Sequence, residues 1–229
     1  MVKKEIVPGL FAPKKGYGAP VHGSDKEHSS KRRLKDINGR VPLPILYEKL
    51  VNSEGWPYRR DKEKYQCRDR SLISAIILTG GRINEVLTLK KDQILDVPDA
   101  PNFKMISNFP VSKRKDGNAE AGIFLDYRSE VAIPLEGAPG LWAELVPFSN
   151  LFLEYIDLVK TGRIYKVTDT RTWQIVDATL GVWNHYLRAV AESHLIRIMK
   201  DSVIVGRYMK VNPETLAKYV QADWRDFTQ

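Results

Sequence analysis

The clearest structural signal in the chain is the stretch RSLISAIILTGGRINEVLTL, residues 70–89. Its first half places apolar residues at the i, i+1, i+4 and i+5 spacing of one helix face, namely Leu72, Ile73, Ile76 and Ile77. This pattern predicts a helix over residues 62–78 that packs against a core. The pair Gly80-Gly81 ends that helix, and a second, short helix is predicted from about Arg82. An arginine is thereby set at the opening of a helix, where free N–H groups favour an anion.

The rest of the chain predicts a mainly helical α+β fold. Apolar periodicity and capping residues predict further helices over 43–51, 143–160, 172–183, 184–199, 201–209 and from Asn212 onward. Residues 103–111 and 122–135 have the character of strands. Turn residues at 112–118 join them and predict an antiparallel hairpin with a basic tip. We therefore expect a helical domain with one small antiparallel β-sheet.

The positive charge is concentrated at the front of the chain. The whole chain carries a net charge of +8; residues 1–40 hold ten Lys or Arg and four acids, which is 10 − 4 = +6 and leaves 8 − 6 = +2 for the remainder. The segment 1–40 is also rich in Gly, Pro and Ser, so we expect a flexible arm followed by a compact domain over 41–229. Two interpretations stay open: a solvated leader, or an arm that contacts DNA phosphates through Lys31, Arg32 and Arg33.

Composition excludes several classes of protein. No apolar run approaches the roughly 20 residues that a membrane helix needs, and the first residues lack the apolar region of a signal peptide. The single cysteine, Cys67, can form no internal disulfide and gives no metal cluster. We expect Cys67 to be a small core residue in a protein of a reducing cytoplasm.

Three features are candidates for chemistry. The first is Arg82 with Glu85 one turn on, the second is His185 with Arg188 at i, i+3, and the third is Tyr219 on the last predicted helix. Taken singly, each has a bland interpretation: a surface arginine, a chance motif and a core tyrosine. Their order and spacing along the chain favour a common site.

Taken in order, three stretches resemble the conserved boxes of the tyrosine recombinases. The first is residues 70–89, the second is HYLRAVAESHLI at 185–196, and the third is MKVNPETLAKYV at 209–220. The resemblance runs over about residues 68–220 and is closest in character to integrases of archaea and their viruses. It implies the recombinase catalytic-domain fold, double-stranded DNA as partner, and cleavage and rejoining through a covalent 3′-phosphotyrosine without metal, ATP or other cofactor.

The resemblance also implies roles for individual residues. Arg82 and Arg188 match the two arginines that grip the scissile phosphate, Glu85 matches a supporting acid, and His185 belongs to the second box. Tyr219 matches the nucleophile. The family's lysine lies on a β-hairpin tip, where Lys113 is slightly preferred over Lys115 and where Arg114 is a further candidate for DNA contact.

The third box departs from the family pattern. Lys210, nine residues before Tyr219, stands where the family has Gly-His or Trp, and a lysine there can still donate to a phosphate oxygen. Arg207, twelve residues before Tyr219, is too far away to take that place. Tyr208 is a rival nucleophile at a short spacing from Arg188.

The front of the chain departs as well. Residues 1–65 are too short for the separate helical domain with which such recombinases clasp DNA. A non-catalytic DNA-binding protein on the same fold therefore stays open, as does an enzyme that relaxes DNA like a type IB topoisomerase, and a basic RNA-binding module is the bland alternative. For a recombinase, the resemblance implies a homo-tetramer on DNA and a place on cellular or mobile-element DNA, with no membrane partner. Because the chain is short, we expect a monomer when it is free.

Overall fold

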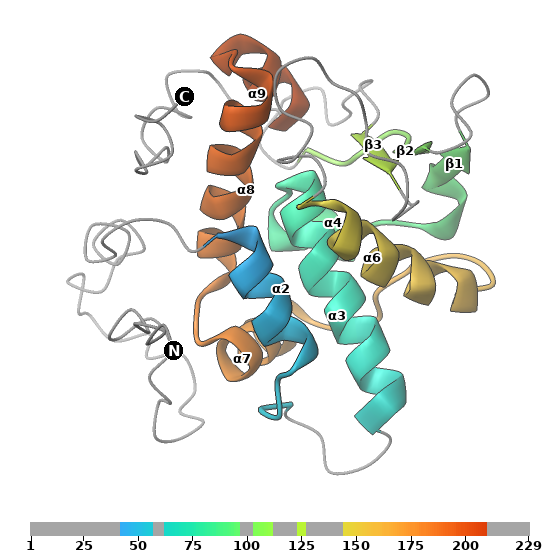
Figure 1. Cartoon of the computed structure of the whole chain (residues 1–229). Coiled ribbons are helices and arrows are strands. Elements are labelled where there is room, and N and C mark those ends of the chain that lie inside the picture. Colours follow the sequence, from blue (N-terminus) through green and yellow to red (C-terminus); the bar gives the residue numbers. More distant parts are fainter. Residues whose placement is uncertain (1–41, 57–61, 97–102, 112–122, 127–143, 210–229) are drawn as a thin grey trace, which may run out of the picture.

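The computed structural model describes residues 42–56, 62–96, 103–111, 123–126 and 144–209. Helix α3 (Lys62–Thr79) runs through the middle of this part of the chain. Helices α6 (Val146–Leu158) and α8 (Asn184–Met199) both pack against α3 (Figure 1). The predicted helix over residues 62–78 is confirmed and extends by one residue.

Helix α3 is more deeply enclosed than its apolar stripe predicts. Every residue from 71 to 80 is buried, including polar ones. The hydroxyl of Ser71 donates to the Phe152 carbonyl oxygen at 3.1 Å and lies 2.8 Å from the Tyr165 hydroxyl. Such partners allow a polar side chain to be buried at little cost. The second half of α3 is therefore the centre of the core rather than a surface helix with one buried face.

The first helix and the aromatic stripe of α6 complete this core. Helix α2 (Leu43–Val51) has the predicted bounds. On α6, Phe148 and Phe152 are fully buried, and Tyr155 stacks on Tyr165 with 6.1 Å between the ring centroids. These aromatic residues of α6 therefore belong to the core. Cys67, by contrast, is only half-buried, so the expectation that it is a core residue is met only in part.

Helices α8 and α9 (Ser202–Met209) lie where the sequence predicts them. Helix α8 has the predicted bounds. Helix α9 is capped by Asp201, whose Oδ1 accepts hydrogen bonds from the main-chain N–H groups of Val203 at 2.7 Å and Ile204 at 3.1 Å. Capping of this kind satisfies N–H groups that the helix itself leaves open.

Helix α7 differs from its predicted range of 172–183. It covers Asp169–Leu180, because the Thr168 hydroxyl oxygen accepts from the Arg171 N–H at 3.2 Å and starts the helix earlier. Its end comes earlier too, because Gly181 adopts a left-handed conformation with φ 70°. A glycine in that conformation is a common helix stop.

The small sheet has three antiparallel strands in the order β1-β2-β3. They are β1 (Ile94–Asp96), β2 (Phe103–Ile106) and β3 (Ile123–Asp126). Ile106 pairs with Ile123, so β2 and β3 flank the predicted turn and the predicted pairing is confirmed. Strand β2 ends at Ile106 rather than at residue 111, because a turn with Asn108 at φ 47° follows it. Strand β1 was not predicted, since three residues show no alternation. The turn at 112–118 lies outside the described residues.

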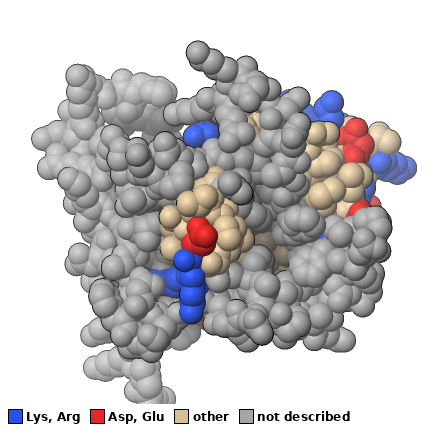
Figure 2. Space-filling model, turned by 90° about the horizontal axis from the view of Figure 1, so that it is seen from above, with Lys and Arg blue, Asp and Glu red and all other residues tan. Residues whose placement is uncertain are grey.

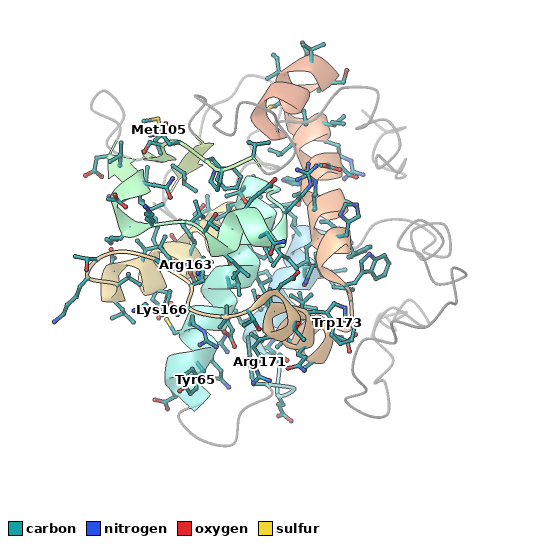
Figure 3. The ribbon with its side chains drawn as sticks, turned by 180° about the vertical axis from the view of Figure 1, so that it is seen from behind. Tyr65, Met105, Arg163, Lys166, Arg171 and Trp173 are labelled. Atoms are coloured by element: carbon teal, nitrogen blue, oxygen red, sulfur yellow. The ribbon has the colours of Figure 1, made fainter. Side chains whose placement is uncertain are left out.

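A loop after α6 fixes the far end of the short helix α4 (Ile83–Leu87). The Arg163 Nε donates to the Leu87 carbonyl at 2.7 Å, and the Ile164 N–H donates to the Leu89 carbonyl at 2.9 Å. The turn η2 (Lys91–Gln93) follows and leads into β1. Figure 3 shows this side from behind, with Arg163 beside the α3–α4 region. The helix that Arg82 opens is thus held at both ends.

Candidate active site

The turn between α3 and α4 sets the position of Arg82. Gly80 has φ 55°, a left-handed conformation that glycine adopts without strain. The Thr79 Oγ1 accepts from the Gly81 N–H at 3.0 Å and donates to the Ala75 carbonyl at 2.6 Å. At Gly81 there is no room for a side chain, because a Cβ atom would lie 2.6 Å from Cζ of Phe109. Both glycines are therefore required by this turn, for different reasons.

Arg82 is held by Glu85 in two ways. The main-chain N–H of Arg82 donates to Glu85 Oε2 at 2.7 Å, and its Nη1 donates to Glu85 Oε1 at 2.8 Å. The Glu85 side chain is 3 % exposed and that of Arg82 is 27 % exposed. Helix α4 spans only five residues, so the positive charge available here is that of the guanidinium rather than of a helix dipole. Glu85 thus orients a half-buried arginine whose outer side remains accessible.

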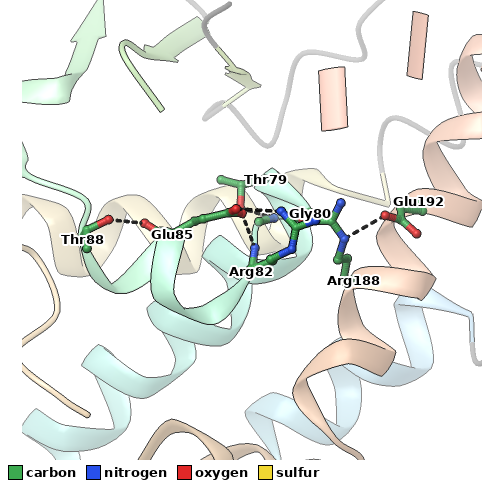
Figure 4. A network of polar contacts seen from close by, with 8 residues as sticks. Thr79, Gly80, Arg82, Glu85, Thr88, Arg188 and Glu192 are labelled. Carbon is green, nitrogen blue, oxygen red and sulfur yellow. Dashed lines mark hydrogen bonds and ion pairs between the residues drawn. The ribbon is translucent and has the colours of Figure 1, made fainter. Parts of the chain in front are cut away.

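Arg188 reaches the same turn from α8. Its Nη1 donates to the Gly80 carbonyl, and its Nε lies 2.9 Å from Oε1 of Glu192, one turn further along α8 (Figure 4). The Arg188 side chain is 4 % exposed, and its Nη2 is a buried nitrogen with no hydrogen-bond partner among the described residues. A buried donor without a partner is costly, and it marks a point where an anion can bind.

Glu192 is a member of this site that the sequence reasoning missed. It is fully buried, and burial raises the pKa of its carboxyl group, while the charges of Arg188 and then Arg82 oppose that rise. The influence of Arg82 on Glu192 means that both arginines act on one small region. The available signal was the i, i+4 spacing from Arg188, which brings an acid and a base together on a helix.

Helix α8 is enclosed on all sides over this region. Its apolar residues Leu187, Val190, Ala191 and Leu195 are buried, but so are its polar residues Arg188, Glu192, Ser193, His194 and Arg197. His194 Nδ1 lies 3.7 Å from Glu144 Oε2. His185 is half-buried in the first turn of α8, one turn before Arg188. An apolar stripe on one side was therefore an incomplete description of this helix.

The structure brings together three of the residues predicted for the site: Arg82, Glu85 and Arg188. A fourth, His185, lies one turn before Arg188 on α8. The other predicted residues lie outside the described part of the chain: Lys31, Arg32, Arg33, Lys113, Arg114, Lys115, Lys210 and Tyr219. For Arg207 and Tyr208 only the helical backbone of α9 is described. The roles of all these residues stay predictions.

Other kinds of site find no support in the described residues. Within them, no group of three or more His, Cys, Asp or Glu side chains could hold a metal ion. No helix in the same ranges has both the length and the apolar character to cross a bilayer. On the face seen from above, acidic groups of the described residues adjoin basic ones, so their charges there do not form one continuous basic patch (Figure 2).

Comparisons with known proteins give a match at the level of structure. No family model and no curated protein matches the chain. Two similar solved structures are crystal structures of the XerH site-specific recombinase, one bound to its difH substrate before cleavage and one bound to palindromic difH substrate after cleavage. Their TM-scores are 0.53 and 0.52, each at 17% identity.

The matches cover 82% and 81% of this chain but 50% and 49% of the recombinase chains, so the shared part spans about half of those proteins. At this identity the likeness shows the fold alone. The predicted fold class, mainly helical with a small antiparallel sheet, is confirmed by the described elements. The chain has the fold of a tyrosine recombinase catalytic domain.

Proposed function

We propose that this chain is a site-specific DNA recombinase that cleaves and rejoins double-stranded DNA through a covalent 3′-phosphotyrosine. The observation that carries the proposal is the meeting of Arg82 and Arg188 at one glycine turn, with a buried Nη2 of Arg188 that has no partner among the described residues. This arrangement lies within a fold shared with a recombinase. The divergence of the boxes fits an integrase of an archaeal or viral mobile element.

The two arginines supply what the reaction needs most. A phosphodiester under attack gathers negative charge on its non-bridging oxygens, and guanidinium groups stay charged at any working pH. Donors that are already oriented stabilise this charge without reorganisation during the reaction. Glu85 orients Arg82, and the Gly80 carbonyl and Glu192 orient Arg188. We assign the phosphate clamp to these two arginines.

Other residues take the covalent and proton-transfer steps in this proposal. The Tyr219 oxygen loses its proton and bonds to phosphorus as the bond from phosphorus to the 5′ oxygen breaks. Lys113, or its neighbour Lys115, protonates the leaving 5′ oxygen. His185 and Lys210 donate to the phosphate oxygens. Rejoining reverses these steps, so no energy source is needed.

DNA is also the partner that the front of the chain suits. The basic segment 1–40, with Lys31, Arg32 and Arg33, contacts the phosphate backbone beside the catalytic domain 41–229, and Arg114 does so from the hairpin tip. Four subunits assemble on two DNA sites during recombination, and the free chain is a monomer. The protein acts on DNA in the cytoplasm of its host cell.

The test is covalent trapping on nicked duplex DNA. The protein is incubated with nicked random-sequence duplexes, denatured in SDS and examined for a DNA-linked band. Wild type should give the band, Tyr219→Phe should abolish it without loss of DNA affinity, and Tyr208→Phe should keep it. A band that survives Tyr219→Phe but disappears in Tyr208→Phe moves the nucleophile to α9.

Two further outcomes separate the alternatives. Relaxation of supercoiled plasmid without a preferred cleavage site indicates a type IB topoisomerase-like activity. DNA binding without a covalent band on any substrate indicates a non-catalytic protein. The second alternative has an observation in its favour, since Glu192 balances the charge of Arg188 before any phosphate arrives.

A further inference from the structure

The described part of the candidate site contains as much negative as positive charge. Arg82 is paired with Glu85, and Arg188 is paired with Glu192. Both carboxylates are almost completely buried, with side-chain exposures of 3 % for Glu85 and 1 % for Glu192. These four groups therefore carry a formal charge of zero, which is unexpected for a site that binds a phosphate. Each carboxylate needs a reason to be there.

Glu85 has such a reason, because it also accepts from the main-chain N–H at the start of α4. Glu192 has no comparable task. It lies in the interior of α8, where main-chain N–H groups are already bonded within the helix. Among the described residues, its ion pair with Arg188 at 2.9 Å is its one close contact with a charged side chain, and neither of its buried carboxylate oxygens has a hydrogen-bond partner of good geometry there. Glu192 is therefore dedicated to Arg188.

That ion pair determines which part of the guanidinium is available. Nε faces Glu192 and Nη1 donates to the Gly80 carbonyl. Nη2 is left as the nitrogen with no partner in the described chain. A rigid, planar guanidinium fixed at two nitrogens presents the third in a defined direction.

We propose that Glu192 is a positioning residue and a counter-charge for Arg188: it holds the Nε edge so that Nη2 faces the phosphate, and it weakens the attraction of the free site for DNA. This inference rests on the proposed function. A counter-charge of this kind reduces tight binding to phosphates at which no reaction follows. The weaker binding is offset by a faster chemical step, because Glu192 holds Arg188 in the orientation that the reaction needs.

The electrostatic surroundings of Glu192 agree with this role. Burial raises the pKa of the carboxyl group, and the two arginines, Arg188 before Arg82, act in the opposite direction. Arg82 has its own carboxylate partner in Glu85. A negative charge retained in such a place comes from its arginine contact, because burial alone disfavours it.

The experiment separates binding from cleavage. Glu192→Gln and Glu192→Ala both remove the negative charge, but only the glutamine keeps a polar oxygen beside Nε. DNA affinity is measured by fluorescence anisotropy on labelled nicked duplexes in a Tyr219→Phe background, where cleavage is blocked. Cleavage is measured as the single-turnover rate of adduct formation at saturating protein in the Tyr219 background. Ser193→Ala, the neighbouring buried residue of α8, is the matched control.

We expect both variants to bind DNA about three- to tenfold more tightly than the Tyr219→Phe parent, because a charge close to the phosphate is removed. The rate of cleavage should depend instead on the contact with Arg188. It should fall at most about tenfold in Glu192→Gln and about a hundredfold or more in Glu192→Ala. Ser193→Ala should change neither quantity more than about twofold. A merely structural role for Glu192 would lower affinity and rate together.

Two results overturn the inference: Glu192→Gln binding no more tightly than its parent, or cleaving as slowly as Glu192→Ala. If Glu192→Ala does not fold, as judged by thermal unfolding, the affinity of Glu192→Gln alone decides. If wild type binds DNA but forms no adduct while Glu192→Gln binds more tightly, the counter-charge is upheld and the proposed enzyme activity falls. If wild type does not bind DNA, both are overturned.

Discussion

Arg188 donates through Nη1 to the main-chain carbonyl of Gly80, a residue 108 positions earlier in the chain. Gly80 adopts a left-handed conformation, with φ 55°, at the turn that also delivers Arg82. The second predicted box is therefore attached to the backbone of the first rather than to a side chain. One turn thus fixes both arginines, so a change in the turn should affect both.

Gly81→Ala should damage the site through packing. A Cβ atom there would meet Cζ of Phe109 at 2.6 Å, and Phe109 is buried, so the turn or the ring must move. We expect a loss of about 1–3 kcal/mol in the free energy of unfolding, as for an overpacked core. Adduct formation should fall at least about tenfold, because Arg82 follows directly. Urea unfolding and the trapping assay measure the two effects.

Gly162→Ala is the control for this experiment. Gly162 has φ 76° and no atom within 4 Å of an added Cβ, so the substitution strains the backbone by about 1–2 kcal/mol without crowding any neighbour. It should leave adduct formation unchanged. Equal loss of cleavage in the two variants would mean that the glycine turn has no special relation to the site.

Replacing Arg188 alone should lower the free energy of unfolding more than replacing Arg188 and Glu192 together. Arg188→Ala leaves the buried Glu192 carboxylate uncompensated, which typically costs about 3–5 kcal/mol of stability. In the double variant Arg188→Met with Glu192→Leu, no buried charge of the pair remains, so most of that stability should return. Neither variant should form the covalent adduct.

Chemical denaturation measured on wild type and both variants gives the comparison. Recovery of stability without recovery of cleavage assigns Arg188 to the reaction rather than to folding. A double variant that cleaves DNA would remove Arg188 from the clamp, and one as unstable as Arg188→Ala would show that the ion pair is not the source of the cost.

Several helices could be predicted with nearly correct bounds, because apolar periodicity and capping depend on residues that are close together in the sequence. Helix α8 has its predicted bounds although its N-cap residue, Trp183, makes no side-chain cap hydrogen bond, because its apolar residues recur with helical periodicity. Asp201 caps α9 through its own neighbours. Strand β1, in contrast, depends on its antiparallel pairing with β2, which no residue of β1 itself reveals. Three residues cannot indicate such a partner by their own pattern.

The sequence predicts only those site residues whose side chains have a chemistry suited to the ligand. Arg82, Glu85 and Arg188 were candidates because their chemistry suits a phosphate. The Gly80 carbonyl was not, since any residue supplies a carbonyl and only the fold brings this one to Arg188. Glu192 was missed because an acid on a helix is usually exposed, whereas α8 is enclosed on all sides here. Burial is a property of the assembled core, not of one helix.

Deletion of residues 1–40 should reduce the salt dependence of DNA binding. That segment contributes +6 of the net charge of +8, so it is the part of the chain best suited to displace counterions from DNA. For each phosphate that the shortened protein no longer neutralises, the slope of log affinity against log salt should fall in magnitude by about 0.9. Anisotropy titrations at several salt concentrations measure this slope. An unchanged slope would assign the segment to a solvated leader.

Glu192 should make stability depend on pH in a defined direction. Burial raises the pKa of this carboxyl group in the folded protein above its ordinary value of 4.5. Between the unfolded and folded pKa values the folded state binds more protons, so unfolding releases them. The stabilisation from the protonated form is full below about pH 4.5 and is lost as pH rises through the folded pKa. Glu192→Gln has no such group.

The free energy of unfolding of wild type minus that of Glu192→Gln should therefore become more negative as pH rises from about 4 to about 7. Using the difference cancels the titration of groups that the two proteins share, and urea unfolding at half-unit pH steps provides it. The opposite trend would mean that Arg188 and Arg82 outweigh burial and hold the pKa of Glu192 below its ordinary value. In that case the ion pair stabilises the ionised carboxylate fully, and Glu192 would be charged wherever the protein is folded.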